Sequence, residues 1–442
     1  MSNKIILTIT SNNNEVDKRT YEERTTCIIG RSPDCSLQLP NDEAHNIISR
    51  YHCLLDINPP AIRVRDLGSR NGTFVNGQLI GQRHPIQTPE EGARMNFPEH
   101  DLQAGDKIEL GNVVIRVGIE VEEPTKPPSQ PLDDLYRILM DLLVRADSGA
   151  PNLLAIRGYT ILKQLGQGGF GAVYLAHHQQ TGTDVALKVM LPKIASDQHA
   201  KQMFLREVEN TKALQHRNVV KVLDSGCSDD IFFFTLEYCE GGSIADLMRR
   251  QREALSIQTA MAIILQVLDG LEYAHNAEIP QVKQADRQFG RGRGLVHRDL
   301  KPGNIFLSNT SGSLRARIGD YGLAKAFDLS GLSGLTRSGT LAGTPYFMPR
   351  QQVINFKYAQ PEVDLWATAA TLYSMLTGTY PREFNRGDPY LVVLQTNAVP
   401  IRQRNASIPK RLAEVIDLAL VDKPKICFQS AAALKQELLA VL

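Results

Sequence analysis

The feature that most constrains this chain is a proline-rich break near residue 120. Residues 120–131, EVEEPTKPPSQP, carry four prolines in twelve positions, a composition that favours extended backbone and is typical of a linker. Before the break, residues 1–119 show only short β-type runs separated by Gly, Asn and Pro. After it, short strands alternate with longer helical patterns. The pattern therefore predicts two modules of different structural class.

Length, charge and hydropathy exclude several kinds of protein. A chain of 442 residues gives a prior of about three domains. With 49 Lys and Arg against 48 Asp and Glu, the net charge is +1, which argues against a globally basic nucleic-acid binder. No apolar run is long enough for a membrane span, and the start, MSNKIILTIT, lacks the features of a signal peptide. We expect neither nucleic acid nor a membrane span.

The cysteines point to a reducing compartment. The six of them, at positions 27, 35, 53, 227, 239 and 427, form no CxxC pair. A disulfide framework or zinc ribbon is therefore not expected, and buried free thiols in the cytoplasm are favoured.

The region before the break predicts an all-β sandwich over residues 1–120. Its β-type runs, KIILTIT, TTCIIG, YHCLLDI, AIRVRDL, GTFVNG, KIELG and NVVIRVGI, recur at a spacing of about ten residues with turn signals between them. Residues 121–157 then hold the linker and an amphipathic helix, expected over 132–145, with Asp133 and Asp134 near its first turn. This helix either packs on a neighbouring domain or serves as a regulatory or dimer-forming element.

A glycine loop opens the second module. Gly166, Gly168 and Gly171 form a GxGxxG, which in a dinucleotide-binding fold leads directly into a helix. Here it leads into VYLAHH, a TGTD turn and VALKVM, which predicts strand, turn and strand. An oxidoreductase is therefore excluded, and the loop is expected to be a flap whose backbone N–H groups reach phosphates.

Four further motifs follow the loop in order. VALK contains Lys188, FLREVENTKAL contains Glu207, LVHRDLKPGNIFL contains Asp299, Lys301 and Asn304, and ARIGDYGLA contains Asp320. Together with the glycine loop they resemble a eukaryotic-type protein kinase of the Ser/Thr class. The resemblance implies a bilobal α+β kinase fold over 158–442.

The resemblance also implies roles for individual residues. Asp299 would accept the substrate hydroxyl proton, Lys301 would contact the γ-phosphate, and Lys188, paired with Glu207, would contact the α- and β-phosphates. Asn304 and Asp320 would hold Mg²⁺, with Mn²⁺ as a substitute. The residues implied to surround ATP are Leu165, Gly166, Gln167, Gly168, Gly169, Phe170, Gly171, Ala172, Val173, Ala186, Lys188, Glu237 and Cys239, with Leu236 as gatekeeper.

The segment after Asp320 departs from the kinase pattern. Gln351 stands where the family has a Glu, and Cys427 where it has the Arg that pairs with that Glu; we expect this double change to be compensated. Thr336, Ser338 and Thr340 are candidate phosphorylation sites that Arg298 could read. The connection 278–294 is longer than usual in the family and is expected to be a solvated loop or a partner contact.

The sandwich carries motifs of its own. Gly30-Arg31, Ser49-Arg50-Tyr51-His52, and Asn71-Gly72-Thr73 with Asn76-Gly77 follow in order. Each alone could be a turn, but in combination they resemble a forkhead-associated (FHA) domain. The resemblance implies that Arg31, Ser49, Arg50 and Asn71 bind phosphothreonine and that His52 braces the loops.

The sequence as a whole is interpreted as a bacterial, eukaryotic-like Ser/Thr protein kinase with an N-terminal FHA domain. We expect it to use ATP and Mg²⁺ to phosphorylate Ser or Thr of proteins. Its FHA domain would bind phosphothreonine peptides or the chain's own phosphorylated segment. The alternative is a phosphopeptide-binding scaffold whose kinase fold is inactive.

Overall fold

The computed structural model divides into two compact units. Unit 1 comprises Met1–Glu123, Gly343–Gln429 and Val441–Leu442, and unit 2 comprises Pro124–Ala342 and Ser430–Ala440. The residues that the structure describes are 4–11, 14–22, 25–42, 45–88, 95, 97–120, 135–149, 153, 156–168, 171–190, 206, 208–228, 231–283, 289–310, 313–321, 345–354, 359–384 and 389–441. Each unit is considered by itself below.

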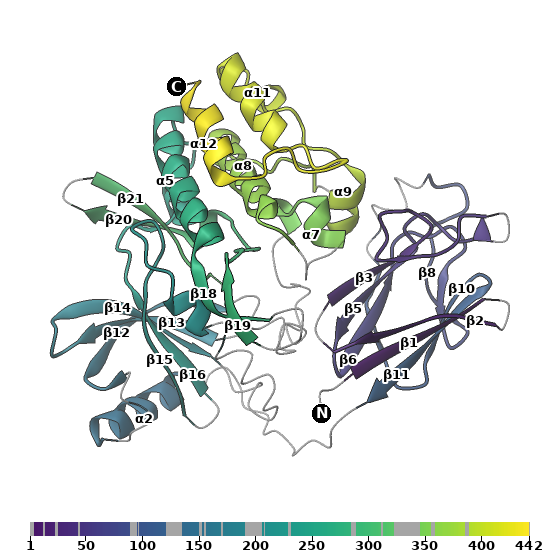
Figure 1. The fold of residues 1–442 in the computed structure, drawn as a ribbon, viewed down its shortest axis with the longest axis horizontal. Helices are drawn as coiled ribbons and strands as arrows, with labels where there is room; N and C mark the ends of the chain where they lie inside the picture. The colour runs from purple at the N-terminus through teal and green to yellow at the C-terminus, as the bar shows by residue number, and fades with distance from the viewer. Residues whose placement is uncertain are drawn as a thin grey trace. The chain divides into compact units, whose positions relative to one another are not determined.

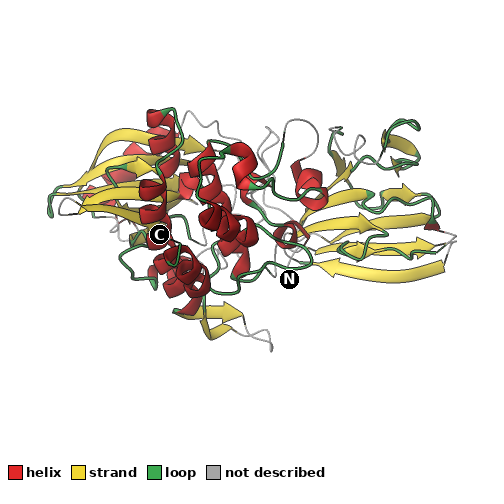
Figure 2. Cartoon of the chain, turned by 90° about the horizontal axis from the view of Figure 1, so that it is seen from above, coloured by secondary structure: helices red, strands yellow, loops and turns green. Residues whose placement is uncertain are grey.

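The first stretch of unit 1 is the expected β-sandwich (Figures 1 and 2). One sheet has the order β2-β1-β11-β10-β7-β8 and the other β4-β3-β5-β6-β9. The strands are β1 (Lys4–Ser11), β2 (Asn14–Tyr21), β3 (Thr25–Gly30), β4 (Leu37–Gln38), β5 (Cys53–Asn58), β6 (Ala61–Asp66), β7 (Thr73–Val75), β8 (Gln78–Gly81), β9 (His100–Leu102), β10 (Lys107–Leu110) and β11 (Val113–Glu120).

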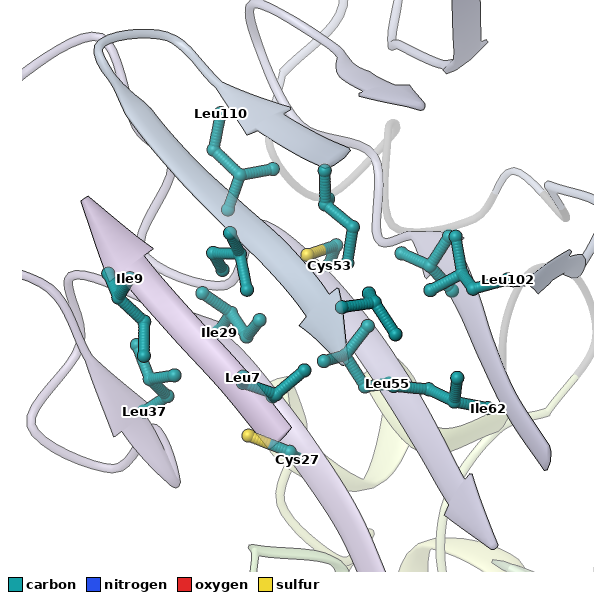
Figure 3. Close-up of a cluster of buried hydrophobic side chains, with 14 of the residues drawn as sticks. Leu7, Ile9, Cys27, Ile29, Leu37, Cys53, Leu55, Ile62, Leu102 and Leu110 are labelled. Atoms are coloured by element: carbon teal, nitrogen blue, oxygen red, sulfur yellow. The ribbon is translucent and has the colours of Figure 1, made fainter. Parts of the chain in front are cut away.

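Alternating apolar residues fill the space between the two sheets. Ile5, Leu7 and Ile9 from β1 are fully buried, and Cys27 and Cys53 lie in the same core (Figure 3). Burial removes water from these thiols and raises the pKa of Cys27 to about 11. Both cysteines therefore serve as small apolar core residues.

The second stretch of unit 1 is helical. It contains η6 (Pro345–Phe347), α7 (Arg350–Ile354), α8 (Glu362–Thr377), α9 (Pro389–Gln395), α10 (Ile401–Arg404) and α11 (Lys410–Ala419). Helix α8 is buried along nearly its whole length, and the indole N–H of Trp366 donates to the Leu420 carbonyl at 3.0 Å.

A cluster of charged side chains lies beside Gln351, one of the two positions at which the Glu–Arg pair of the kinase family is absent. The buried Asp422 carboxylate forms ion pairs with Arg350 and with Arg382, the latter at 2.5 Å. The Gln351 amide donates to the Asp422 carbonyl at 2.6 Å, and Cys427 is exposed. Two arginines thus surround one aspartate beside Gln351, and Cys427 is not part of this buried cluster.

Unit 2 begins with a helix on a sheet. Helix α2 (Leu135–Asp147) buries Leu139, Leu142 and Leu143 against strands of the sheet β12-β13-β14-β16-β15. Of the expected helix 132–145, residues 132–134, including Asp133 and Asp134, lie outside the described residues, and the described helix continues to Asp147. The strands are β12 (Tyr159–Gly168), β13 (Gly171–His178), β14 (Thr183–Met190), β15 (Val222–Ser228) and β16 (Ile231–Glu237).

The rest of unit 2 is mainly helical, with five short strands in two small sheets. It contains β17 (Gly242–Ser243), α4 (Ile244–Gln251), α5 (Ile257–Asn276), β18 (Glu278–Lys283), β19 (Phe289–Arg293), η4 (Pro302–Asn304), β20 (Ile305–Thr310), β21 (Ser313–Ile318) and α12 (Ala431–Leu439). In the connection 278–294, expected to be a solvated loop or a partner contact, the described residues pair as the antiparallel strands β18 and β19. Helix α12 packs on α5 (Figure 1). Within the described part of the chain, no helix is both long and apolar enough to cross a membrane.

Candidate catalytic site and phosphate-binding face

Two ion pairs define the candidate catalytic site in unit 2. Lys188, on β14, places its Nζ 2.9 Å from Oδ1 of Asp320. Burial raises the pKa of Asp320, but the Lys188 ammonium outweighs it and the pKa lies below its usual value. Asp320 therefore stays ionised at neutral pH. Its backbone adopts the left-handed region, with φ of 59°, where a non-glycine residue is uncommon.

The second ion pair lies in the loop before β20. The Lys301 ammonium lies 2.9 Å from Oδ2 of Asp299, and the Asn304 amide donates to the same oxygen at 3.0 Å. The Asn304 amide also donates to the Asp299 carbonyl at 2.8 Å. The carboxylate is thus fixed from two sides, and the Asn304 amide oxygen is turned away from it.

Backbone bonds join the two ion pairs into one site. The Gly319 N–H donates to the Asn304 carbonyl at 2.8 Å, and the His297 ring meets the Gly319 carbonyl at 2.8 Å. Asp320 follows Gly319 directly. All four residues predicted to act in catalysis and described by the structure, Asp299, Lys301, Asn304 and Lys188, therefore belong to a connected hydrogen-bonded assembly with Asp320.

A pocket of about 650 Å³ adjoins this assembly. Of the residues predicted to surround ATP, it is lined by Leu165, Gly166, Val173, Ala186, Lys188, Glu237 and Cys239, with the predicted gatekeeper Leu236. Ala172 lies instead in the core beneath α2, because side chains alternate between the two faces of a strand and Val173 takes the pocket face. Gln167 is outside the lining and bonds Gln164 at 3.0 Å.

Gly169, Phe170, Glu207 and the candidate phosphorylation sites Thr336, Ser338 and Thr340 lie outside the described residues. Gly168 and Gly171 end β12 and begin β13, where they pair with each other. The glycine loop therefore lies between two antiparallel strands, as the sequence predicts.

Several lining residues were not anticipated. Val220 and Phe306 line the pocket, and the Glu237 carboxylate is paired with Arg317. Phe306 lies on β20, two residues after Asn304, which ends η4. The Arg317 contact is long-range and has no local sequence signal.

The phosphate-binding face predicted for the sandwich lies in unit 1. Arg31, Ser49 and Arg50 line a single pocket of about 820 Å³. The Arg31 guanidinium contacts the amide oxygens of Asn41 and Asn46 and donates to the Ile48 carbonyl at 2.6 Å. Asn71 does not line this pocket; its amide donates to the carbonyl of the lining residue Ile47 at 2.6 Å.

Two structural residues hold these loops. His52 is fully buried; its Nδ1 accepts from the Ser49 N–H at 3.1 Å and its Nε2 meets the Gly72 carbonyl at 3.0 Å. His52 thus braces the loops, as expected, and does not face ligand. Gly30 is required by close approach, because a Cβ there would lie 2.1 Å from the Arg50 carbonyl oxygen.

Two protein-family models match the sequence of this chain. The model for the protein kinase domain matches residues 159–425, and the model for the FHA domain matches residues 27–111. The chain belongs to the protein kinase family. The fold class predicted from sequence, an FHA sandwich followed by a kinase domain, is confirmed.

Curated relatives agree with this assignment. The chain is similar to a probable serine/threonine-protein kinase, CPE1738, of Clostridium perfringens, with 29% identity over 62% of this chain and 36% of that protein. It is also similar to the serine/threonine-protein kinase PknF of Mycobacterium tuberculosis, with 30% identity over 62% of this chain and 54% of that protein. The chain thus spans between about a third and a half of these relatives.

Solved structures match as well. The crystal structure of Rad53 1-466 in complex with AMP-PNP covers 98% of this chain and 99% of its own, with 19% identity and a TM-score of 0.49. The crystal structure of the PknI kinase domain of Mycobacterium tuberculosis covers 64% of this chain, with 24% identity and a TM-score of 0.48.

Proposed function

We propose that this chain is a Ser/Thr protein kinase that transfers the γ-phosphoryl group of ATP to Ser or Thr hydroxyls of proteins. The observation that carries the proposal is the Asp299 carboxylate, held by Lys301 and Asn304 and joined through Gly319 to the Lys188–Asp320 pair. Phosphoryl transfer needs positioning and compensation of charge more than covalent chemistry, and this assembly supplies both.

The pocket beside the assembly suits a nucleotide. Apolar side chains, among them Leu165, Val173 and Phe306, line it where a base would lie, and Lys188 and Asp320 line it where phosphates would lie. Burial raises the pKa of the Cys239 thiol to about 12, so this cysteine stays uncharged and acts as part of the apolar wall.

The oxygen donors fit a divalent cation. The ionised Asp320 and the amide oxygen of Asn304 are hard ligands of the kind that Mg²⁺ prefers, and Mn²⁺ accepts the same donors. When bound, such an ion would offset the negative charge of the phosphates. Asn304 suits this role because its amide nitrogen is fixed on Asp299, which determines the direction of its oxygen.

The chemical step follows from this arrangement. The substrate hydroxyl gives its proton to Asp299 as its oxygen forms a bond to the γ-phosphorus, and the bond from that phosphorus to the bridging oxygen of ADP breaks. Lys301, which lies against Asp299, would stabilise the transferring phosphoryl group. Lys188 would hold the remaining phosphates.

The FHA sandwich supports a second part of the proposal, the binding of phosphothreonine peptides. Arg31 and Ser49 lie in one pocket, and the contacts of the Arg31 guanidinium are to amide and carbonyl oxygens. A dianionic phosphate is a stronger acceptor than these neutral oxygens. Such binding would recruit phosphorylated proteins or the chain's own segment around Thr336, Ser338 and Thr340.

Buried thiols such as Cys27 suit the cytoplasm, which we propose as the location of this chain.

Transfer of radiolabelled phosphate from ATP by the full chain tests the proposal. Wild type should label itself or a protein substrate in the presence of Mg²⁺, and Asp299→Ala should not. Asp101→Ala, which removes an exposed carboxylate of the sandwich, is the matched control and should behave as wild type. Mass spectrometry of the labelled chain would locate modification at 336, 338 or 340. An inactive wild type that still binds phosphothreonine peptides would favour the scaffold alternative.

A further inference from the structure

The pocket of unit 2 is bounded by the ends of two strands. Strand β16 ends at Glu237, next to the predicted gatekeeper Leu236, and both residues line the pocket. Strand β21 ends at Ile318, and Asp320, which also lines the pocket, follows two residues later. A nucleotide in this pocket would have its base beside β16 and its phosphates beside Asp320. The separation of the two strand ends therefore decides whether base and phosphates bind together.

One ion pair between side chains joins the two strands. The Glu237 carboxylate is paired with the guanidinium of Arg317, which stands three residues before Asp320. The Arg317 side chain is only 12% exposed, against 37% for Glu237. Among the described residues, Glu237 is the only acid that forms an ion pair with Arg317, and the buried Arg317 Nε has no hydrogen-bond partner. Glu237 therefore supplies the counter-charge for this largely buried cation.

Backbone hydrogen bonds provide a second link between the same strands. The Glu237 N–H donates to the Lys221 carbonyl at 3.0 Å, and the Val220 N–H donates to the Ile318 carbonyl at 2.8 Å. The two adjacent residues 220 and 221 thus bind the end of β21 and the end of β16. Together with the ion pair, these bonds close a ring, and a ring restrains the strand separation more than either link alone.

The β21 end of this ring leads directly into the catalytic assembly. Arg317 is the β-sheet partner of Phe306, which lines the pocket. Two residues after Arg317, the Gly319 N–H donates to the Asn304 carbonyl at 2.8 Å. A displacement of Arg317 would therefore be passed to the pocket wall and to the backbone that carries Asp320.

The choice of two charged residues for this link points to a role beyond packing. Two apolar side chains of similar volume would fill the same space without the cost of taking charges out of water. A charge-assisted hydrogen bond between guanidinium and carboxylate has, in contrast, a preferred distance and direction. Such a bond fixes a separation, which apolar contacts do less sharply.

We propose that Glu237 and Arg317 are positioning residues, whose ion pair holds β16 at the distance from Asp320 that a bound nucleotide requires. The inference rests on the proposed use of ATP and extends it to a pair of side chains outside the assembly around Asp299. When the two subsites are held at the correct separation, binding of the base raises the effective concentration of the phosphates at their own subsite. Loss of the ion pair should therefore weaken ATP, which occupies both subsites, more than adenosine, which occupies one.

Calorimetric titration of the full chain in the presence of Mg²⁺ tests this role, with AMP-PNP and adenosine as probes. The variants are Glu237→Gln, Arg317→Met, the double variant that combines them, and the conservative Arg317→Lys. The matched control is Arg315→Met, because Arg315 lies on the same face of β21 and forms no ion pair in the described part of the chain. Thermal unfolding and the KM for ATP are measured on the same preparations.

Each neutral single variant should lose about tenfold in affinity for AMP-PNP and less than about twofold for adenosine. The KM for ATP should rise accordingly. The double variant should recover the melting temperature of wild type, because it leaves no buried charge without a partner, but it should not recover the affinity for AMP-PNP. Arg317→Lys, which keeps the charge, should retain most of that affinity, and Arg315→Met should retain all of it.

Recovery of AMP-PNP affinity together with stability in the double variant would show that the ion pair acts only on folding, and would overturn the inference. An equal loss for AMP-PNP and adenosine, or the same loss in Arg315→Met, would also overturn it. If wild type binds AMP-PNP but transfers no phosphate from ATP, the proposed kinase activity fails while the titrations still decide this inference. If wild type binds neither probe, the pocket is not a nucleotide site and both proposals fail.

Discussion

The two candidate phosphate sites of this chain manage charge in opposite ways. In the kinase site each lysine is paired with an acid: Lys188 with Asp320 and Lys301 with Asp299. On the FHA face the Arg31 contacts are amide and carbonyl oxygens. Both sites would bind a phosphate, yet the two lysines of the first are ion-paired with acids, whereas the Arg31 guanidinium contacts neutral oxygens even though Asp34 and Glu383 also line its pocket.

The difference follows from what each site has to do. A kinase must bind a polyanion together with a cation, move one phosphoryl group and release both products, and for this it needs acids as proton acceptor and metal ligands. A recognition face only has to bind, so an acid beside Arg31 would weaken its ligand and serve no step. In this chain, carboxylates paired with the lysines therefore distinguish the kinase site, called the reacting site below, from the FHA face around Arg31, called the reading site below.

The largest expected effect is on the reacting site. Lys188→Met should lower phosphoryl transfer by at least about a hundredfold, because the phosphates lose a positioned charge. Burial raises the pKa of Asp320 and the Lys188 ammonium lowers it, so removal of that ammonium should raise this pKa, with His297 and Lys301 left to oppose the effect of burial. Steady-state kinetics and the pH profile of the residual activity measure both effects.

A matched control for this variant is Lys163→Met, on β12 of the same sheet, whose side chain is exposed. It should retain wild-type kinetics. If Lys188→Met also retained them, the proposed role of the Lys188–Asp320 pair would be wrong.

The next effect is on stability and concerns the buried Asp422 cluster. Asp422→Ala would leave two buried guanidinium groups, on Arg350 and Arg382, without their carboxylate. Burial already lowers the pKa of Arg382 to about 10 although Asp422 raises it. Removing one partner of a buried ion pair costs about 3–5 kcal/mol. We expect a loss of this size in the free energy of unfolding by denaturant.

The exposed carboxylate of Glu414 provides the comparison, since Lys410 lies 3.8 Å away from it at the surface. Glu414→Ala should change the free energy of unfolding by less than about 1 kcal/mol. Equal destabilisation by the two substitutions would show that Asp422 does not hold the cluster.

A smaller effect is expected on the reading site. Arg31→Gln should weaken binding of a phosphothreonine peptide by about 10- to 100-fold, the value of a charge-assisted hydrogen bond. The free energy of unfolding should stay near that of wild type, because removal of the Arg31 guanidinium leaves no buried carboxylate without its partner. Calorimetric titration and thermal unfolding of the same preparation test the contrast with Asp422→Ala. A large loss of stability in Arg31→Gln would contradict it.

Sequence patterns named residues that the structure brings together where those residues lie close in the chain. The motif around Asp299 placed Lys301 and Asn304 within five residues of it, and these side chains meet as short-range geometry requires. The Gly30-Arg31 pair was also found from its motif, but the reason for the glycine, the close approach of the Arg50 carbonyl, came only from the structure.

Long-range contacts and polar strands were not predictable in the same way. Strand β2 is polar and mostly exposed, so it lacks the apolar alternation that reveals a strand. The hairpin β18–β19 was expected to be a loop, because its glycines and charges resemble loop composition. The cluster around Asp422 joins residues that are 40 and 72 positions apart. No local sequence pattern predicts that these residues are in contact.

The smallest expected effect is a pH dependence of the FHA sandwich set by His52. Burial lowers the pKa of His52 below its usual value of 6.5, and its Nδ1 must stay unprotonated to accept from the Ser49 N–H. Because the unfolded chain binds this proton more readily, His52 lowers stability as pH falls from about 6.5 towards its folded pKa. Above pH 6.5 both states are neutral at this residue and the effect vanishes.

Thermal unfolding of wild type and His52→Asn between about pH 5 and pH 8 isolates this contribution, since all other titrating groups are shared. Asparagine can replace one of the two ring contacts but does not titrate. The difference in melting temperature should therefore shrink as the pH falls, because only the wild type loses stability through this group. A difference in melting temperature that is constant across the range would mean that His52 titrates alike in the folded and unfolded chain. The hydrogen bond from the Ser49 N–H to neutral His52 would then contribute nothing to the pH dependence of the sandwich.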